Sequence, residues 1–272
     1  MNILFWNIKG NSVASYVARC ALENNADVIC LAEHLGVRPD VLCSSLGNQY
    51  RWVSGVNDSE KNKVILFARS DVRQVSNGQL LEPFHRCVIW SFECDGEVYN
   101  LVALHLVDRG SEPDPNARRH DASRMMAELL RREKQSGCEN SIVIGDFNSD
   151  PFEAPLVAKD AFNATLFDVI NSHPVRRRYD EEFRMMYNPV VHYLSEETKC
   201  YGSFYWGKGF SDLYWHCYDQ ALVSPSLADR VRDFRYLRAI DEESLLAGVK
   251  PKATISDHLP LLLTIGGTEH EQ

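Results

Sequence analysis

The sequence predicts an α/β protein that has two β-sheets with helices on their outer faces. Short apolar runs rich in β-branched residues recur along the 272 residues, and polar residues bound each run, as is typical of buried strands. Two of these runs, at residues 87–94 and 98–104, are joined across Asp95-Gly96, a dipeptide typical of hairpin turns. Helical periodicity separates other runs, for example at residues 117–134. Hairpins with interspersed helices favour one domain with two sheets over a purely parallel, alternating fold.

Each expected element follows from its local pattern. Strands are expected at residues 2–6, 28–32, 50–56, 64–68, 87–94, 98–104, 142–144, 218–223 and 259–265. Helices are expected at residues 12–24, with Ser12 as the N-cap, and at 38–46, 117–134 and 152–159. Residues 107–116 are polar and carry two prolines, which predicts a loop, and residues 172–203 predict an irregular insert. We expect one domain at residues 1–266 and a polar tail at residues 267–272.

Composition limits the classes of function. With 44% hydrophobic and 25% charged residues, the chain has enough apolar material for a core. No apolar run approaches the ~20 residues of a membrane span, and the N-terminus lacks the basic region and the apolar length of a secretory signal. The eight cysteines include no CxxC pair, so we expect reduced thiols in a cytoplasmic protein. The net charge of −9 argues against broad, non-specific coating of DNA but is compatible with a local basic surface.

Residues 141–151, SIVIGDFNSDP, are the most informative stretch. A β-branched run stops and is followed by Gly145, Asp146 and Asn148. Asp146 and Asn148 project from the same side if the backbone stays extended, and Gly145 permits a close backbone approach beside them. Asp and Asn are also common turn residues, so this segment alone leaves a turn and a catalytic strand end equally open. Asp150 has no role here beyond the turn.

Other strands also end in polar side chains. The full set at or beside strand ends is Asn7, Glu33, His105, Asp146, Asn148, Asp219, Asp257 and His258. One such residue is commonplace, but a set this rich in metal ligands and acid–base groups predicts a site along one rim of the sheets.

The chemistry that suits this set is phosphoester hydrolysis with a divalent cation. Mg²⁺ prefers oxygen ligands and keeps several waters, so one or two carboxylates suffice to hold it. Glu33 and Asp257 fit that role, and Asn7 would help through its side-chain oxygen. The cation would stabilise the extra negative charge of the transition state.

The remaining residues of the set suit proton transfer and phosphate binding. Asp146 would orient or deprotonate the attacking water. Asn148 and a histidine would donate hydrogen bonds to phosphate oxygens. Asp219 would hold His258, which makes that imidazole a well-defined donor.

Six segments taken together resemble the endonuclease/exonuclease/phosphatase superfamily, which includes DNase I, exonuclease III-type apurinic endonucleases and neutral sphingomyelinases. In chain order they read NILFWNIKG, ICLAEH, LVALHL, IVIGDFNSDP, YDQALV and SDHLPLLL. The resemblance extends over nearly the whole chain. It implies a four-layer α/β sandwich with two central mixed β-sheets flanked by helices, and dependence on Mg²⁺ or Mn²⁺.

The resemblance also assigns roles residue by residue. Glu33 matches the metal-binding Glu, and Asn7 the Asn of the first strand. His105 matches the His of the DNase I and sphingomyelinase branches. The Asp-x-Asn pair of the family matches Asp146 and Asn148. The final His, the Asp that orients it and the metal-proximal neighbour match His258, Asp219 and Asp257.

Two departures from the family pattern affect these assignments. Ala32 precedes Glu33 where the family often has Gln. The segment that would place a Glu behind His105 offers Asn62 instead, which fits a turn or a substrate contact better than an acid–base partner.

The aromatic segment at residues 201–218 is the main candidate for substrate contact. Tyr205 and Trp206 could stack bases, or they could pack the loop onto the core, and both alternatives stay open. The basic run at residues 176–178 could touch a phosphate backbone but is typical of a solvated loop.

These observations predict a Mg²⁺- or Mn²⁺-dependent phosphoester hydrolase. A nuclease that cleaves phosphodiester bonds with an activated water is the favoured form, with nucleic acid as the substrate, no protein partner and a monomeric state. The alternative is a phosphatase or phosphodiesterase that acts on a small molecule or a lipid head group. A catalytically idle binding module is the alternative of another class.

Overall fold

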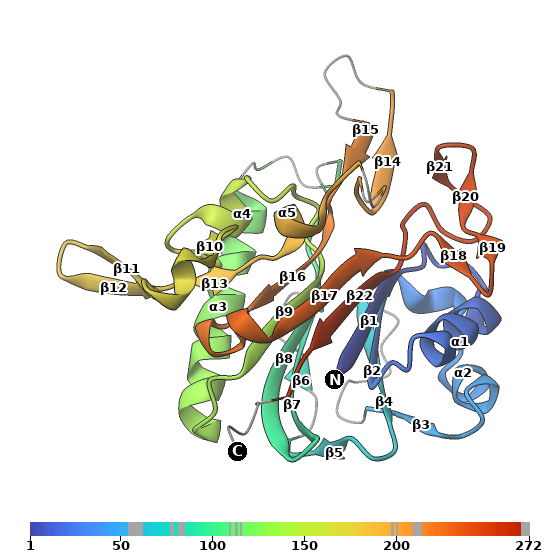
Figure 1. Cartoon of the computed structure of the whole chain (residues 1–272), viewed down its shortest axis with the longest axis horizontal. Helices are drawn as coiled ribbons and strands as arrows, with labels where there is room; N and C mark the ends of the chain where they lie inside the picture. The colour runs from blue at the N-terminus through green and yellow to red at the C-terminus, as the bar shows by residue number, and fades with distance from the viewer. Residues whose placement is uncertain are drawn as a thin grey trace.

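The computed structural model describes residues 1–53, 62–76, 79–80, 85–108, 110–111, 114, 116–196, 199, 201–208 and 214–267. Figure 1 shows two central sheets, with helices α1 (Ala14–Glu23) and α2 (Pro39–Ser45) beside one sheet and α3 (Ala117–Ser136) beside the other. The predicted four-layer α/β sandwich is therefore confirmed. The last three residues of the strand expected at 50–56, and the tail from residue 268, lie outside the described residues.

The first sheet has the strand order β17-β22-β1-β2-β4-β3. Its strands are β17 (Val231–Tyr236), β22 (Leu261–Ile265), β1 (Asn2–Asn7), β2 (Val28–Ala32), β4 (Val64–Arg69) and β3 (Tyr50–Trp52). Strands β1 and β2 are parallel, and β22 runs antiparallel to β1. The C-terminal ends of β1 and β2 therefore lie at the same edge as the start of β22.

The second sheet has the order β10-β13-β16-β9-β8-β7-β5, with β6 paired to β7. Its strands are β10 (Ala164–Thr165), β13 (Met186–Tyr187), β16 (Asp219–Val223), β9 (Ser141–Asp146), β8 (Glu97–His105), β7 (Cys87–Cys94), β5 (Arg73–Gln74) and β6 (Gln79–Leu80). The expected hairpin across Asp95-Gly96 is present as β7 and β8. Strand β9 is parallel to β8 and antiparallel to β16, so the C-terminal ends of β8 and β9 lie at the same edge as the start of β16.

Both faces of β8 and β9 are buried, which explains their continuous apolar sequences. Ile142 and Ile144 join the core between the two sheets, whereas Val143 faces α3 and joins a second core with Met125 and Leu129. This alternation follows from the two-residue period of a strand. Every residue of β9 is buried, and the strand thus holds its last residue, Asp146, in a fixed position.

Gly145 is required by the close approach of β8. A Cβ atom at this position would lie 2.1 Å from the backbone oxygen of Leu104, which is far shorter than a van der Waals contact. The expected close backbone approach beside Asp146 is present.

Four small antiparallel pairs lie outside the two sheets. They are β11–β12 (Val175–Arg178 and Glu181–Arg184), β14–β15 (Phe204–Trp206 and Tyr214–His216), β18–β19 (Ala239–Ile240 and Glu243–Ser244) and β20–β21 (Leu246–Ala247 and Lys250–Pro251). Short helices α4 (Ala154–Val157) and α5 (Val190–Tyr193) and three 3₁₀ turns (His34–Gly36, Asp168–Asn171 and Pro225–Arg230) complete the described elements. In Figure 1, β14–β15 and β20–β21 project from the same end of the molecule, and β11–β12 projects from its side.

Two local predictions were wrong. The described residues between 172 and 203 are not an irregular insert, because they include β11, β12, β13 and α5. Helix α1 begins after Val13, and no side chain caps it, so Ser12 is not its N-cap. No helix in the described part of the chain is both long enough and apolar enough to cross a membrane.

Candidate active site

The two sheets bring the predicted polar strand ends to one edge of the molecule. Asn7 ends β1, and Glu33 follows β2 directly. In the second sheet His105, at the end of β8, is in register with Asp146, at the end of β9. Asp219 starts the antiparallel strand β16 and lies opposite Asp146. The loop before β22, which holds residues 257–258, returns to the same edge because β22 is antiparallel to β1.

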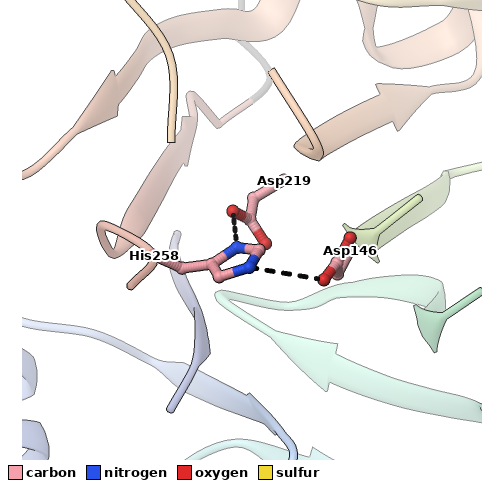
Figure 2. A group of neighbouring side chains, drawn as sticks. All are labelled: Asp146, Asp219 and His258. Atoms are coloured by element: carbon pink, nitrogen blue, oxygen red, sulfur yellow. Dashed lines mark hydrogen bonds and ion pairs between the residues drawn. The ribbon is translucent and has the colours of Figure 1, made fainter. Parts of the chain in front are cut away.

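His258 lies between two buried carboxylates. Its Nδ1 atom is 2.7 Å from Asp219 Oδ2, and its Nε2 atom is 3.9 Å from Asp146 Oδ2 (Figure 2). The expected contact between Asp219 and His258 is thus present in the structure. Because Nδ1 faces Asp219, the Nε2 edge of the imidazole is left to face Asp146 and the space beside it.

Hydrogen bonds to the backbone fix the position of the Asp219–His258 pair. The Ser256 hydroxyl donates to the carbonyl of Asn7, at 2.6 Å, and accepts a hydrogen bond from the backbone N–H of His258, at 3.1 Å. Trp6 Nε1 donates to the His258 carbonyl at 2.9 Å, and the Tyr236 hydroxyl donates to the Asp219 carbonyl at 2.7 Å. These contacts tie the loop before β22 to both sheets.

Burial and pairing act in opposite directions on this pair. Burial alone would lower the pKa of His258, but the charge of Asp219 and the hydrogen bond that His258 donates to it outweigh burial and raise the pKa to about 10. Burial dominates at Asp219 and raises the pKa of that carboxyl group despite the adjacent imidazole. The pairing is decisive for His258, because an ionised Asp219 at 2.7 Å stabilises the imidazolium directly. The contact with Asp219 therefore favours the protonated form of His258.

Asn7 joins Glu33 to Asp146. Its Nδ2 atom donates to Glu33 Oε1 at 3.1 Å and to Asp146 Oδ2 at 2.9 Å. Its side-chain oxygen accepts from the backbone N–H of Lys9 at 3.0 Å. The amide orientation follows from this chemistry, since carboxylates need a donor and the N–H needs an acceptor. The side-chain oxygen that was expected to help hold a cation therefore faces away from Glu33 in this conformation.

His105 completes the cluster from the second sheet. Its Nε2 atom lies 3.6 Å from Glu33 Oε1 and 3.7 Å from Asp146 Oδ2. Burial lowers the pKa of His105, and the carboxylates of Asp146 and Glu33 only partly offset this effect. Among the described residues, no hydrogen-bond partner faces its Nδ1 atom, in keeping with the absence of the family Glu behind it.

The carboxylates fit a hard cation, although not in the arrangement that was expected. Glu33 and Asp146 converge on one amide nitrogen, and no lysine or arginine of the described chain forms an ion pair with either. Uncompensated carboxylate oxygens of this kind suit Mg²⁺ or Mn²⁺. Asp257 instead binds Lys9 Nζ at 2.6 Å. The ligand atoms of Asp146, Asp219 and His258 also lie within 4.8 Å of one another, close enough to surround a cation, although the last two already bind each other.

Two of the cluster residues have left-handed backbones. Glu33 has φ 48° and Asn148 has φ 46°. A left-handed glutamate is uncommon and costs on the order of 1 kcal/mol, which is typical of a functional position. Asn148 therefore does not continue an extended strand, so the condition for its projection to the same side as Asp146 is not met. Its backbone N–H binds Asp146 Oδ1 at 2.8 Å, and its Nδ2 atom donates to the Leu106 carbonyl at 2.9 Å.

The predicted substrate contacts lie in two cavities beside the cluster. Asn62 is buried and lines a cavity of about 380 Å³ together with Glu33 and His105. Tyr205 and Trp206 line a different cavity, of about 540 Å³, which also includes Asp257. Tyr205 packs against Trp215 with a ring-centroid distance of 5.5 Å, whereas Trp206 is 44% exposed, so packing of the loop is seen at Tyr205 and base stacking stays a prediction for Trp206. Phe210 of this segment lies outside the described residues.

Sequence reasoning missed several contacts around the cluster. Asp150, to which only a turn was assigned, accepts from the backbone N–H of Cys217 at 2.9 Å and binds His216 Nδ1 at 2.7 Å. Phe204 places its ring 4.8 Å from the ring of His258. The only signal for Asp150 was an acidic residue two positions after the GDFN segment, and nothing in the sequence pointed to His216 as its partner.

Similar solved structures share this fold at low sequence identity. A mannosyl-6-phosphatase of Bacteroides thetaiotaomicron has a TM-score of 0.64 and 16% identity, over 98% of this chain and all of that chain (100%). An endonuclease/exonuclease/phosphatase family protein of the same organism has a TM-score of 0.63 and 17% identity, over 97% and 96% of the two chains. TDP2 of D. rerio complexed with single strand DNA product has a TM-score of 0.58 and 17% identity, over 98% and 99%.

The sequence itself matches a family model. No curated protein matches the chain significantly. The model of the endonuclease/exonuclease/phosphatase family, in contrast, matches residues 4–258, which include every member of the polar cluster. The chain therefore belongs to the endonuclease/exonuclease/phosphatase family, a family of phosphoester hydrolases.

Proposed function

We propose that this protein is a metal-dependent phosphodiesterase, with nucleic acid as its favoured substrate. The observation that carries the proposal is the surrounding of Asp146 Oδ2, which lies near Asn7 Nδ2 (2.9 Å), His105 Nε2 (3.7 Å) and His258 Nε2 (3.9 Å). A buried carboxylate among three nitrogen groups is suited to hold a water molecule for attack while nearby donors bind an anion. A binding module has no need for this arrangement together with the Asp219–His258 pair.

The chain's own residues have distinct roles in this mechanism. Asp146 orients the attacking water and accepts its proton. His258, held through Nδ1 by Asp219, donates from Nε2 to a phosphate oxygen and brings positive charge to the transition state. His105 lines the same space and binds a second phosphate oxygen. Asn148 has one remaining amide hydrogen for phosphate after its bond to Leu106.

Glu33 would hold Mg²⁺ or Mn²⁺, with Asp146 beside it and Asn7 after its amide turns. The bound cation supplies Lewis-acid stabilisation of the phosphoryl oxygens and of the leaving oxygen. Asp257 would contribute only after it releases Lys9, so we assign it a weaker part in metal binding than Glu33.

Two cavities near the polar cluster are compatible with a diester substrate. One cavity contains Glu33 and His105, and the other begins at Asp257, beside His258. A phosphodiester carries a substituent on each side of the reacting phosphorus and can occupy both cavities, whereas a monoester fills one. The similar D. rerio structure, which holds a single strand DNA product, is consistent with a nucleic acid substrate.

A phosphomonoester of a small molecule is the second candidate. The net charge of −9 is unusual for a protein that grips long nucleic acid, and one similar structure is that of a mannosyl-6-phosphatase. Under this alternative only the cavity beside His105 would hold the substrate, and the aromatic cavity would be unused.

An activity panel tests the proposal. The purified protein is assayed with Mg²⁺, Mn²⁺ or EDTA on single- and double-stranded DNA, RNA, abasic DNA, nucleotides, inositol phosphates, sugar phosphates and bis(p-nitrophenyl) phosphate. We expect cation-dependent cleavage of nucleic acid. Turnover of monoesters alone would favour the second candidate, and turnover of nothing would favour a binding module.

Two variants test the assigned roles. Asp146→Asn and His258→Ala are each expected to lower the rate by about 100- to 10,000-fold while the circular dichroism spectrum stays unchanged. Asp160→Asn and His173→Ala change exposed residues of the same types and serve as matched controls. Full activity in either active-site variant would overturn the mechanism.

A further inference from the structure

A cavity of about 540 Å³ lies between the two hairpins that project beyond the active-site edge. Hairpin β14–β15 contributes Phe204 and Trp206, and the segment from β20–β21 toward β22 contributes Lys250 and Lys252. Strand β14 contacts β21, so the two hairpins meet rather than project independently. The cavity thus has one aromatic wall and one basic wall.

The aromatic wall starts at the catalytic histidine. The Phe204 ring lies 4.8 Å from the ring of His258, and the Trp206 ring lies 6.4 Å from that of Phe204 at an interplanar angle of 13°. Phe204 and Trp206 are two residues apart on one strand and therefore project to the same side. A row of rings leads from His258 into the cavity, and Trp206 at its far end is 44% exposed.

The basic wall carries charge that the protein does not neutralise. Lys208, Lys250 and Lys252 all line the cavity, and none forms an ion pair with a carboxylate of the described chain. Asp257 is the one acidic lining residue, and it already binds Lys9 at 2.6 Å. Lys208 Nζ lies 5.3 Å from the centroid of the Trp206 ring, which places a cation beside the aromatic wall. In a chain of net charge −9, this cavity is locally positive.

We propose that this cavity binds the nucleotide next to the scissile phosphate of a single-stranded nucleic acid. The base stacks on Trp206, and the neighbouring phosphate lies against Lys250 and Lys252. This inference rests on the proposed function and names the substrate class for it. Stacking on an exposed ring requires an unpaired base, and lysines without partners bind phosphate by charge.

Binding of two probes separates the aromatic wall from the basic wall. The probes are a fluorescein-labelled hexathymidylate and an abasic hexamer with the same phosphates but no bases. Their binding to the Asp146→Asn protein is followed by fluorescence anisotropy, so that cleavage does not interfere.

We expect Trp206→Ala to raise the Kd for hexathymidylate by about 5- to 100-fold and to leave the abasic hexamer nearly unchanged. Lys250→Gln and Lys252→Gln should each weaken the binding of both probes. Each should also reduce the slope of log Kd against log salt concentration by about 0.7, the value for one lost phosphate contact on a single strand.

Matched controls change the same residue types elsewhere. Tyr179→Ala removes an exposed aromatic residue next to β11, and Lys134→Gln removes one positive charge from the last turn of α3. Neither should change the Kd of either probe. Equal effects of the cavity variants and these controls, or no binding by the parent protein, would overturn the proposal. An effect of Trp206→Ala on both probes alike would overturn base stacking.

These outcomes are independent of the proposed hydrolysis. If the wild-type protein hydrolyses bis(p-nitrophenyl) phosphate but the cavity variants bind both probes normally, the phosphoesterase stands and the nucleotide site fails. If the variants weaken binding but no substrate is cleaved, the nucleotide site stands and the hydrolase fails.

Discussion

The two halves of the polar cluster differ in how firmly the protein holds them. In the half from the second sheet and the loop before β22, the side chains of Asp219 and Asp146 are 0% and 2% exposed, and that of His258 is 8% exposed. In the half nearer the first sheet, Glu33 is 40% exposed and Asp257 is 31% exposed. The side chains of the buried half make hydrogen bonds to other groups of the protein. The carboxylate oxygens of the open half stay accessible to solvent.

This difference suits a division of work within one site. The proton donor that we propose, His258, needs a fixed orientation, which the hydrogen bonds of its side chain to Asp219 and of its backbone N–H to Ser256 supply. Ligands for Mg²⁺ must remain reachable by the ion and its waters, as Glu33 does. We therefore expect substitutions in the buried half to change the rate, and those in the open half to change the metal requirement.

The largest effect is expected from Asp219→Asn. The amide keeps the shape of the side chain but removes the charge that stabilises the His258 imidazolium, so kcat should fall by about 100-fold or more. Because Asp219 raises the pKa of His258, its neutralisation should lower that pKa, as measured by NMR titration of the ring. The Mg²⁺ concentration for half-maximal rate should stay the same. An unchanged pKa of His258 in this variant would show that Asp219 does not stabilise the imidazolium, which would contradict its positioning role.

The sequence made the buried half predictable because strands constrain it. Apolar runs located β1, β2, β8, β9 and β16, and each predicted polar residue on them lies at the first or last position of its strand or directly after it. Strand ends at the same edge of the sheets lie close together regardless of the paths of the loops. This is why Asn7, His105, Asp146 and Asp219 come together as expected, and why the family motifs in the same segments agree with the fold.

Contacts that depend on loops were not predictable, because local patterns do not determine the paths of loops. The Lys9–Asp257 pair joins residues 248 positions apart, and no periodicity relates them. Asn148 has a left-handed backbone, so the chain is not extended at this position. Asn tolerates this conformation but also adopts others, so the residue type alone does not predict it. Asp150 and His216 meet only because hairpin β14–β15 returns to the end of β9.

The second-largest effect is expected from Glu33→Gln in the open half. Loss of one carboxylate should raise the Mg²⁺ concentration for half-maximal rate by at least about tenfold, and high Mg²⁺ should restore much of kcat. Glu182→Gln, an exposed residue of β12, is the matched control. A fall in kcat that added Mg²⁺ does not restore would place Glu33 in the chemical step rather than in metal binding.

A smaller effect is expected from Tyr236→Phe, which loosens the buried half without touching its charges. The variant loses the hydrogen bond from the hydroxyl to the Asp219 carbonyl, so the free energy of unfolding should fall by about 1 kcal/mol. The rate should fall only a few-fold, because Asp219 keeps its contact with His258. Urea unfolding measures the first quantity, and Tyr179→Phe, which alters an exposed hydroxyl, should change neither.

The smallest effect is expected from Lys9→Met. This variant tests whether the ammonium group of Lys9 competes with a divalent cation for Asp257 in the open half. Lys9 and Asp257 are 47% and 31% exposed, so their ion pair should contribute less than about 1 kcal/mol to stability. Removing the lysine leaves Asp257 without a counter-charge beside the site, and a divalent cation is the charge that can replace it. The Kd for Mn²⁺, measured by titration calorimetry, should therefore fall by a few-fold, whereas Lys9→Arg should leave it unchanged. A weaker Mn²⁺ affinity in Lys9→Met would mean that the ion pair shapes the site for the metal instead of competing with it.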